Sequence, residues 1–158
     1  MPLPISNIWR MLSWKITTVT ERILIDTGPI VAILIPADRH HGWASDQFSS
    51  LPPPLFTCEA VLSEAQFLVH RFGGDPVAVL EMITKGVLNV AFNAEAEADR
   101  LIKLQRTYQN LPMSLADACL VRMSELHARS RVFTLDSDFR IYRRHGRQVI
   151  PVLAPPTV

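Results

Sequence analysis

The chain has 158 residues, which is enough for one domain with a substantial core but short for two. Its residues are 48% hydrophobic and 20% charged, which excludes a disordered chain. The net charge of +1 excludes a globally basic nucleic-acid-binding protein, so a polyanionic partner would have to bind a local basic patch.

The longest apolar stretch is interrupted at residues 26–29 (DTGP), so the sequence predicts no membrane span. The N-terminal residues mix cations with apolar side chains and lack a small-residue cleavage site, which argues against a signal peptide. The two cysteines, Cys58 and Cys119, lie far apart without a CxxC pattern, so neither a disulfide framework nor a zinc site is indicated. We expect a cytoplasmic protein with reduced thiols.

Residues 1–21 are predicted to form an N-terminal extension, 22–153 one domain, and 154–158 a tail. The first predicted strand covers 23–25 and ends at Asp26, and the Gly28-Pro29 pair then starts a helix that runs to residue 35. The later elements are predicted in this order: helix 40–50, strand 55–57, helix 59–72, helix 76–85, strand 87–92, helices 94–108 and 114–128, strand 131–135, helix 137–145 and strand 148–153. Strands that alternate with helices predict the α/β class with a mostly parallel sheet, in which sites form at the carboxyl ends of the strands.

Acidic residues fall where such a site is expected. Asp26 ends the first strand, and Asp136 ends the fourth in the segment TLDSDF, with Asp138 two residues later. Asp117 lies in the first turn of the helix in SLADACL, where Ser114 and Asp117 have the spacing of a capping box. Taken singly, each of these acids is explained by a cap or a turn.

Glu64 is harder to explain in this way, because its neighbours three and four positions away along the helix are all apolar. A glutamate on an apolar stripe is costly to bury without a positive partner, unless the helix is rotated so that Glu64 reaches solvent. Four acids at one sheet edge would raise one another's pKa values unless a cation neutralised them. Oxygen ligands suit Mg²⁺ or Mn²⁺, and the predicted chemistry is metal-assisted attack on a phosphate ester.

Five segments resemble, in order, the motifs of PIN-domain ribonucleases of the VapC toxin class: DTGPIVAIL, ADRHHGWA, TCEAVLSEAQFL, MSLADACLVRMSE and VFTLDSDFRIYRRHG. The resemblance covers about residues 22–153, and the first twenty residues depart from the family pattern. It implies a three-layer α/β/α fold with a small, mostly parallel sheet, divalent-metal dependence and endonucleolytic cleavage of RNA. It also implies a homodimer and a cognate antitoxin whose tail occupies the active-site groove.

The family's catalytic and metal-binding quartet carries over by resemblance onto Asp26, Glu64, Asp117 and Asp136. Asp138 is an additional ligand or a substitute for Asp136, and Glu64 binds the metal directly or through water. In this hypothesis either Glu64 or Asp117 orients the attacking water.

Two threonines and a group of arginines complete the predicted site. Thr134 matches the hydroxyl residue that the family often places before its last acid, and Thr27 follows the first acid. An arginine cluster directly after the acids is predicted to bind the RNA backbone, the alternative being a solvated helix face. Its members are Arg140, Arg143, Arg144 and Arg147.

Three other hypotheses stay open at this point. An aspartyl protease also carries DTG, but it needs a paired aspartate on an all-β scaffold, and this chain has one DTG among several helices. A phosphatase-like enzyme with Asp26 as nucleophile would need a lysine near the last strand, where the sequence has only arginines. The third is a PIN-like binding module without activity, against which the presence of all four acids argues.

Overall fold

A computed structural model of the chain describes residues 20–156, so that only Thr20 and Glu21 of the predicted N-terminal extension fall within it. Its central sheet is parallel throughout and has the strand order β3-β2-β1-β4-β7. The strands are β1 (Arg22–Ile25), β2 (Leu55–Thr57), β3 (Leu88–Val90), β4 (Ser130–Phe133) and β7 (Val152–Leu153).

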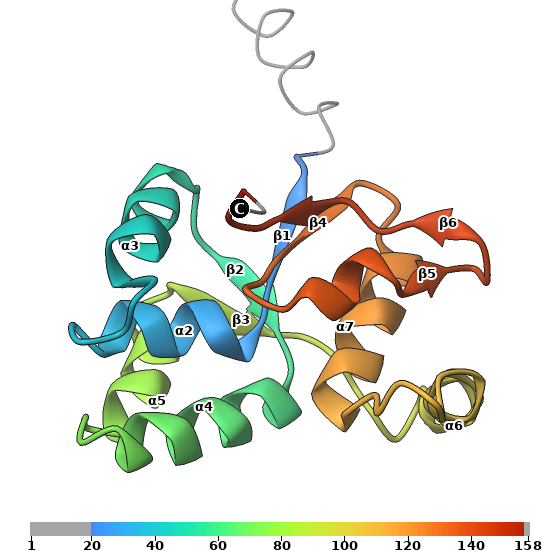
Figure 1. The fold of residues 1–158 in the computed structure, drawn as a ribbon, viewed down its shortest axis with the longest axis horizontal. Coiled ribbons are helices and arrows are strands. Elements are labelled where there is room, and N and C mark those ends of the chain that lie inside the picture. The colour runs from blue at the N-terminus through green and yellow to red at the C-terminus, as the bar shows by residue number, and fades with distance from the viewer. Residues whose placement is uncertain (1–19, 157–158) are drawn as a thin grey trace, which may run out of the picture.

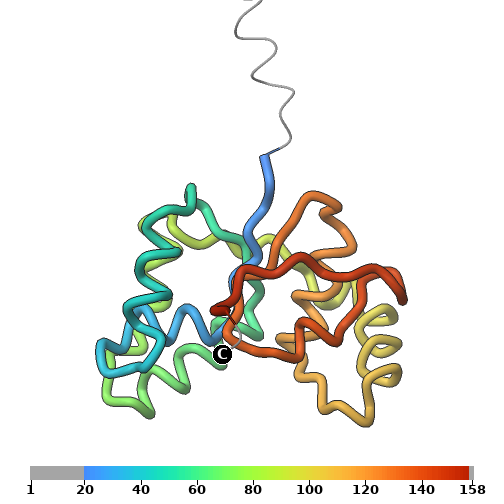
Figure 2. The backbone as a smooth tube through the Cα atoms, turned by 45° about the horizontal axis from the view of Figure 1, so that its top comes forward, coloured from blue at the N-terminus to red at the C-terminus, as the bar shows by residue number. Residues whose placement is uncertain are grey.

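Helices cover both faces of this sheet. The first group links β1 through β2 to β3 and comprises α2 (Thr27–Leu34), α3 (His41–Ser50), α4 (Glu59–Arg71) and α5 (Val77–Thr84). The second group, α6 (Ala98–Thr107) and α7 (Leu115–Leu126), returns the chain to β4. Since β2 and β4 lie on opposite sides of β1, right-handed crossovers place the two groups on opposite faces. Figures 1 and 2 show these three layers, which confirm the predicted fold class.

The two central strands are apolar on both faces because each face is covered by helices. Leu24 and Ile25 of β1 and Val132 and Phe133 of β4 are all inaccessible to solvent. Trp43 of α3 packs edge-on against Phe133, with 5.7 Å between the ring centroids. This rigid pair of strands carries the acids described below. In the part of the chain that is described, no helix is long and apolar enough to cross a membrane.

The predicted helix over 137–145 is wrong. A single 3-10 turn, η1 (Ser137–Arg140), is followed by a hairpin of β5 (Arg143–Arg144) and β6 (Gln148–Val149). His145 and Gly146 both have positive φ, 51° and 80°, which suits a tight hairpin turn and not a helix. The predicted strand 148–153 is likewise divided into β6 and β7, because Pro151 between them has no N–H to donate to a ladder.

Candidate active site

The acids lie at the carboxyl ends of β1 and β4, the two neighbouring strands between which the strand order reverses. The connections from β1 and β4 leave towards opposite edges, and the carboxyl ends of such strands form a crevice. The Asp26 backbone N–H continues the pairing of the two strands by donating to the Phe133 carbonyl, 3.0 Å away. The Asp26 side chain caps α2, because Oδ1 accepts the Thr27 N–H at 2.7 Å.

Thr134 connects two of the acids. Its side chain is fully buried, and Oγ1 donates to Asp26 Oδ2 at 2.7 Å while it accepts the Asp136 N–H at 2.9 Å. Thr57, at the end of β2, donates its hydroxyl to the Ile25 carbonyl at 3.0 Å and so fixes the same edge of the sheet. The sequence pattern identified Thr134 but not Thr57, which no motif distinguishes.

Asp26 is held in an environment that disfavours its charge. The residue is only 6% exposed, and burial raises its pKa from an ordinary 3.8 to about 7. Hydrogen bonds from Thr134 and Thr27 oppose this shift, whereas the negative charges of Asp117 and Asp136 add to it. Carboxylates from three different elements therefore lie close enough to perturb one another.

Asp117 is half-buried in the first turn of α7 and forms the predicted capping box. Its N–H donates to Ser114 Oγ at 3.0 Å, and its Oδ2 accepts the Ser114 N–H at 3.0 Å. Burial raises its pKa, and the charge of Asp136 raises it further. The fully buried Tyr142 donates its hydroxyl to Asp117 Oδ2 at 3.4 Å. No sequence motif identified this tyrosine, because its segment was predicted to be helical.

Asp136 precedes η1 and caps it, whereas Asp138 lies within η1. Asp136 is exposed and caps the turn, with Oδ1 accepting the Asp138 N–H at 2.8 Å. The pKa of Asp138 is raised, chiefly by burial and also by Asp136. Asp136 raises the pKa of both Asp26 and Asp117, which favours it as the fourth acid of the set.

The prediction that Glu64 is a carboxylate buried on an apolar stripe is wrong. Helix α4 buries Val61 and Ala65 but turns Glu64 to solvent, and Phe67 is 62% exposed beside it. The alternative of a rotated helix is therefore correct. Glu64 still joins the site, because its Oε2 accepts the Thr27 hydroxyl at 3.0 Å.

The four arginines do not form one free basic face. Arg140 and Arg147 are exposed, but Arg143 donates Nη1 to the backbone carbonyls of residues 140–142 at 2.7 to 2.9 Å. Arg144 donates Nη1 to the Ser124 and Ala128 carbonyls at 3.4 and 3.1 Å. These two side chains attach the hairpin segment to neighbouring backbone.

The acids suit a hard divalent cation by their chemistry. All donors are carboxylate oxygens, and the pKa values of Asp26 and Asp117 are raised by burial and further by neighbouring negative charges, so a bound cation would favour their ionised forms. Within residues 20–156, however, no three His, Cys, Asp or Glu side chains are gathered closely enough to hold a metal ion. Cap hydrogen bonds engage Asp117 Oδ2 and Asp136 Oδ1, and among the described residues no hydrogen bond engages the second oxygen of either carboxylate.

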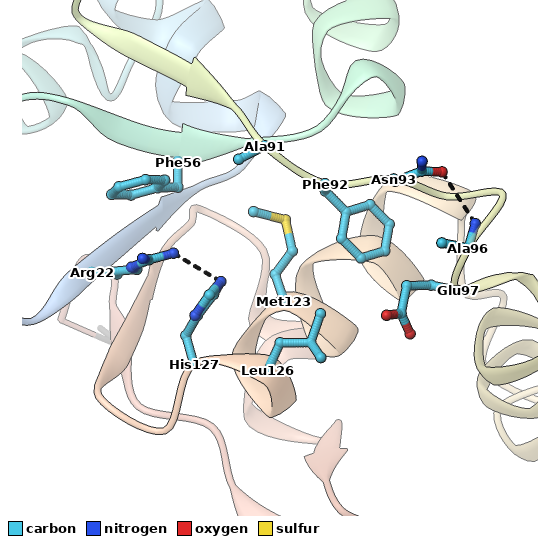
Figure 3. Close-up of a pocket in the computed structure, with 10 residues that line it drawn as sticks. All are labelled: Arg22, Phe56, Ala91, Phe92, Asn93, Ala96, Glu97, Met123, Leu126 and His127. Carbon is cyan, nitrogen blue, oxygen red and sulfur yellow. Dashed lines mark hydrogen bonds between the residues drawn. The ribbon is translucent and has the colours of Figure 1, made fainter.

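A separate cavity of about 190 Å³ lies beside the last turn of α7 (Figure 3). Its lining includes none of the predicted acids. Arg22 lies over the Phe56 ring, 4.8 Å from its centroid, and donates Nη1 to His127 Nε2 at 3.0 Å. The polar groups of this cavity therefore already interact with each other.

The fold and the position of the acids are those of a small α/β enzyme domain, and comparisons specify its family. The sequence model of the PIN domain matches residues 23–144, and the chain therefore belongs to the PIN domain family. The chain is 27% identical over 132 residues to Ribonuclease VapC26 of Mycobacterium tuberculosis, a match that covers 82% of this chain and 93% of the relative.

Two solved structures share the fold. One is Mycobacterium tuberculosis VapC20, described as a toxin that cleaves the sarcin-ricin loop, with a TM-score of 0.66 and 24% identity over 73% of this chain and 91% of that one. The other is a toxin-antitoxin complex from Klebsiella pneumoniae, with a TM-score of 0.57 and 19% identity over 87% of this chain and 99% of that one.

Proposed function

We propose that this chain is a metal-dependent endoribonuclease and the toxin of a toxin–antitoxin pair. The observation that carries the proposal is the convergence of Asp26, Asp117 and Asp136 from three elements at the carboxyl edge of the sheet. Membership of the PIN domain family and the likeness to a protein named as a ribonuclease support RNA as the substrate.

We assign the cation, Mg²⁺ or Mn²⁺, to Asp26, Asp117 and Asp136, with Glu64 as a direct or water-mediated ligand. When bound, such a cation would supply an activated water and stabilise charge on the scissile phosphate. Thr134 fixes the orientation of the Asp26 carboxylate through its 2.7 Å hydrogen bond.

Thr27 orients Glu64, the acid of the set that lies on α4. Thr27 holds Glu64 through the 3.0 Å hydrogen bond from its hydroxyl. Glu64 or Asp117 would accept a hydrogen bond from the attacking water, since both side chains reach solvent. Asp138, two residues after Asp136, would be an additional ligand or a substitute for Asp136.

The other enzyme hypotheses lose support. The central sheet is parallel and covered by helices, which is incompatible with an aspartyl protease scaffold. Asp26 has both oxygens engaged by hydrogen bonds and is 6% exposed, which disfavours attack on a phosphate ester. Failure to trap an aspartyl-phosphate after incubation with a phosphate-ester substrate is therefore expected.

The protein partners are part of the proposal. The fold is shared with a toxin-antitoxin complex, which supports an antitoxin as partner, and a homodimer is our proposal for the free chain. Large apolar side chains on and between α4 and α5 are about half exposed and provide a protein-binding surface: Phe67, Phe72, Val77 and Leu80. A cytoplasmic location agrees with the buried free thiols of Cys58 and Cys119. Light scattering after size-exclusion chromatography tests the dimer, and co-purification with the product of an adjacent short reading frame tests the antitoxin.

The enzymatic proposal is tested by incubating labelled single-stranded and hairpin RNA with the protein in Mg²⁺, Mn²⁺ or EDTA. We expect internal cleavage with at least one metal and none in EDTA. Asp26→Asn and Asp117→Asn are expected to lower the rate at least about a hundredfold. Asp46→Asn, which removes an exposed carboxylate on α3, is the matched control and retains the parent rate. An inert parent with both metals, or variants as active as the parent, would contradict the proposal.

A further inference from the structure

A second polar cleft, of about 430 Å³, lies between α6, α7 and the turn of the β5–β6 hairpin. In Figures 1 and 2 these three elements lie side by side on the same side of the sheet. Four cationic side chains line the cleft, Arg100, Lys103, Arg122 and Arg143, and the single acid in its lining is Glu125. The cleft is therefore a local basic patch on a chain whose net charge is only +1.

Glu125 serves to position two of these cations. Its side chain is 1% exposed and accepts Arg100 Nε at 2.9 Å and Arg122 Nη1 at 3.0 Å on Oε2. Oε1 accepts a second hydrogen bond from Arg100 and the His145 N–H at 2.9 Å. Burial opposes ionisation of this carboxyl, but the arginine and backbone hydrogen bonds outweigh it and lower its pKa to about 2. Glu125 thus stays charged and holds both guanidinium groups in place.

The positive charge of the cleft exceeds the negative charge. Arg122 also donates Nε to Glu97 Oε2 at 2.6 Å, so that Glu125 and Glu97 offset two of the four cations. Arg143 is fixed by backbone carbonyls, which leave its charge uncompensated. Within residues 20–156, Lys103 takes part in no ion pair and is exposed at the rim.

The cleft adjoins the acid cluster through two tyrosines. Tyr108 lines the cleft and accepts the Arg143 N–H at 2.9 Å. Its ring packs edge-on against Tyr142, with centroids 5.0 Å apart, and the Tyr142 hydroxyl contacts Asp117. A nucleic-acid strand that has one phosphate at Asp117 and continues past Tyr142 and Tyr108 would reach the cleft. The acids themselves repel a polyanion, so cations beside them are needed to hold it.

We propose that this cleft binds the phosphate backbone of the RNA on one side of the scissile bond. This inference rests on the proposed function and specifies where its substrate continues. A guanidinium group has five N–H donors, so Arg100 and Arg122 retain donors for phosphate oxygens while paired with Glu125. Lys103 contributes a mobile charge at the entrance, and Tyr108 offers an aromatic ring for a base.

The test uses the full-length Asp26→Asn protein, which we expect to bind RNA without cleaving it. Fluorescence anisotropy with a labelled single-stranded RNA is measured over a series of NaCl concentrations. Lys103→Glu is expected to raise Kd about tenfold at low salt and to reduce the slope of log K against log salt by about 0.7. Lys85→Glu, an equal charge change at the exposed lysine that follows α5 and pairs with Glu81, is the control and shifts Kd less than about twofold. Lys103→Arg should restore parental binding.

Two outcomes would overturn the inference. In one, Lys103→Glu leaves Kd and the salt slope unchanged, or Lys85→Glu weakens binding equally. In the other, polyglutamate of equal charge binds in place of RNA, which would identify the cleft as a surface for an acidic protein. Both are read from binding alone, whereas the proposed function fails on cleavage, either because the parent protein is inert or because Asp26→Asn and Asp117→Asn cleave RNA as well as the parent does. The two failures are therefore distinguishable.

Discussion

Replacement of Asp26 by asparagine is expected to stabilise the metal-free protein while abolishing its activity. Burial raises the pKa of Asp26 from 3.8 to about 7, so keeping this carboxylate ionised in the folded chain costs free energy. A shift of about 3 pKa units at about 1.4 kcal/mol per unit gives a cost of about 4 kcal/mol at pH 8. An asparagine avoids this cost and keeps the Thr27 cap, but it weakens the Thr134 hydrogen bond by about 1 kcal/mol. The expected net gain is about 3 kcal/mol.

The pH dependence of this gain follows from proton linkage. The folded chain keeps the Asp26 proton up to about pH 7, whereas the unfolded chain loses it near its ordinary value of 3.8. Between these values the unfolded state binds fewer protons, so the stability of the parent protein falls as the pH rises. At pH 5 most of this loss has not yet occurred, and the variant should gain less than about 1 kcal/mol.

Urea-induced unfolding in EDTA at pH 5 and pH 8 measures both quantities. Asp46→Asn is the control, because it removes an exposed carboxylate and should leave the free energy of unfolding nearly unchanged at both pH values. Added Mg²⁺ or Mn²⁺ should stabilise the parent protein and not Asp26→Asn. The reasoning is refuted if Asp26→Asn is no more stable than the parent at pH 8, or if its gain is the same at both pH values.

Three further substitutions separate stability from activity. Glu125→Gln should lower the free energy of unfolding by about 3 kcal/mol at pH 7. This loss should shrink as the pH falls from about 4.5 towards 2, where the parent carboxylate is also protonated. Urea unfolding at both ends of this pH range measures the loss, and an equal loss throughout would contradict the ion-pair explanation. Gly74→Ala should cost about 1 to 3 kcal/mol, because its new Cβ would lie 2.7 Å from Ile35 Cδ1, and thermal unfolding should show this with kcat unchanged well below the Tm. Tyr142→Phe removes the 3.4 Å hydrogen bond that lowers the pKa of Asp117. At limiting metal concentration the pH–rate profile should therefore move to higher pH, with less than about a threefold change in maximal rate. A large loss of kcat at every pH would instead indicate a direct catalytic role for Tyr142.

Local sequence determined much of the fold and the inner part of the site. Every strand of the central sheet was predicted near its observed position, because buried parallel strands are short apolar runs bounded by turn residues. Asp26 and Asp136 were recognisable because each directly follows such a run, and Asp117 because it shares a capping box with Ser114. These signals depend on residues within a few positions of each other.

The tertiary structure decided the features that depend on distant contacts. The orientation of Glu64 is set by the rotation of α4 against α2, and the intrinsic pattern of α4 indicated the opposite face. The hairpin is held by its contacts with α7, since the His145 N–H donates to Glu125, twenty residues away. The pKa of Asp26 near 7 likewise arises from its burial in the packed domain, to which the charges of Asp117 and Asp136 add. Burial and electrostatic repulsion are properties of the packed molecule, so the sequence identifies the acids and the fold determines their charge.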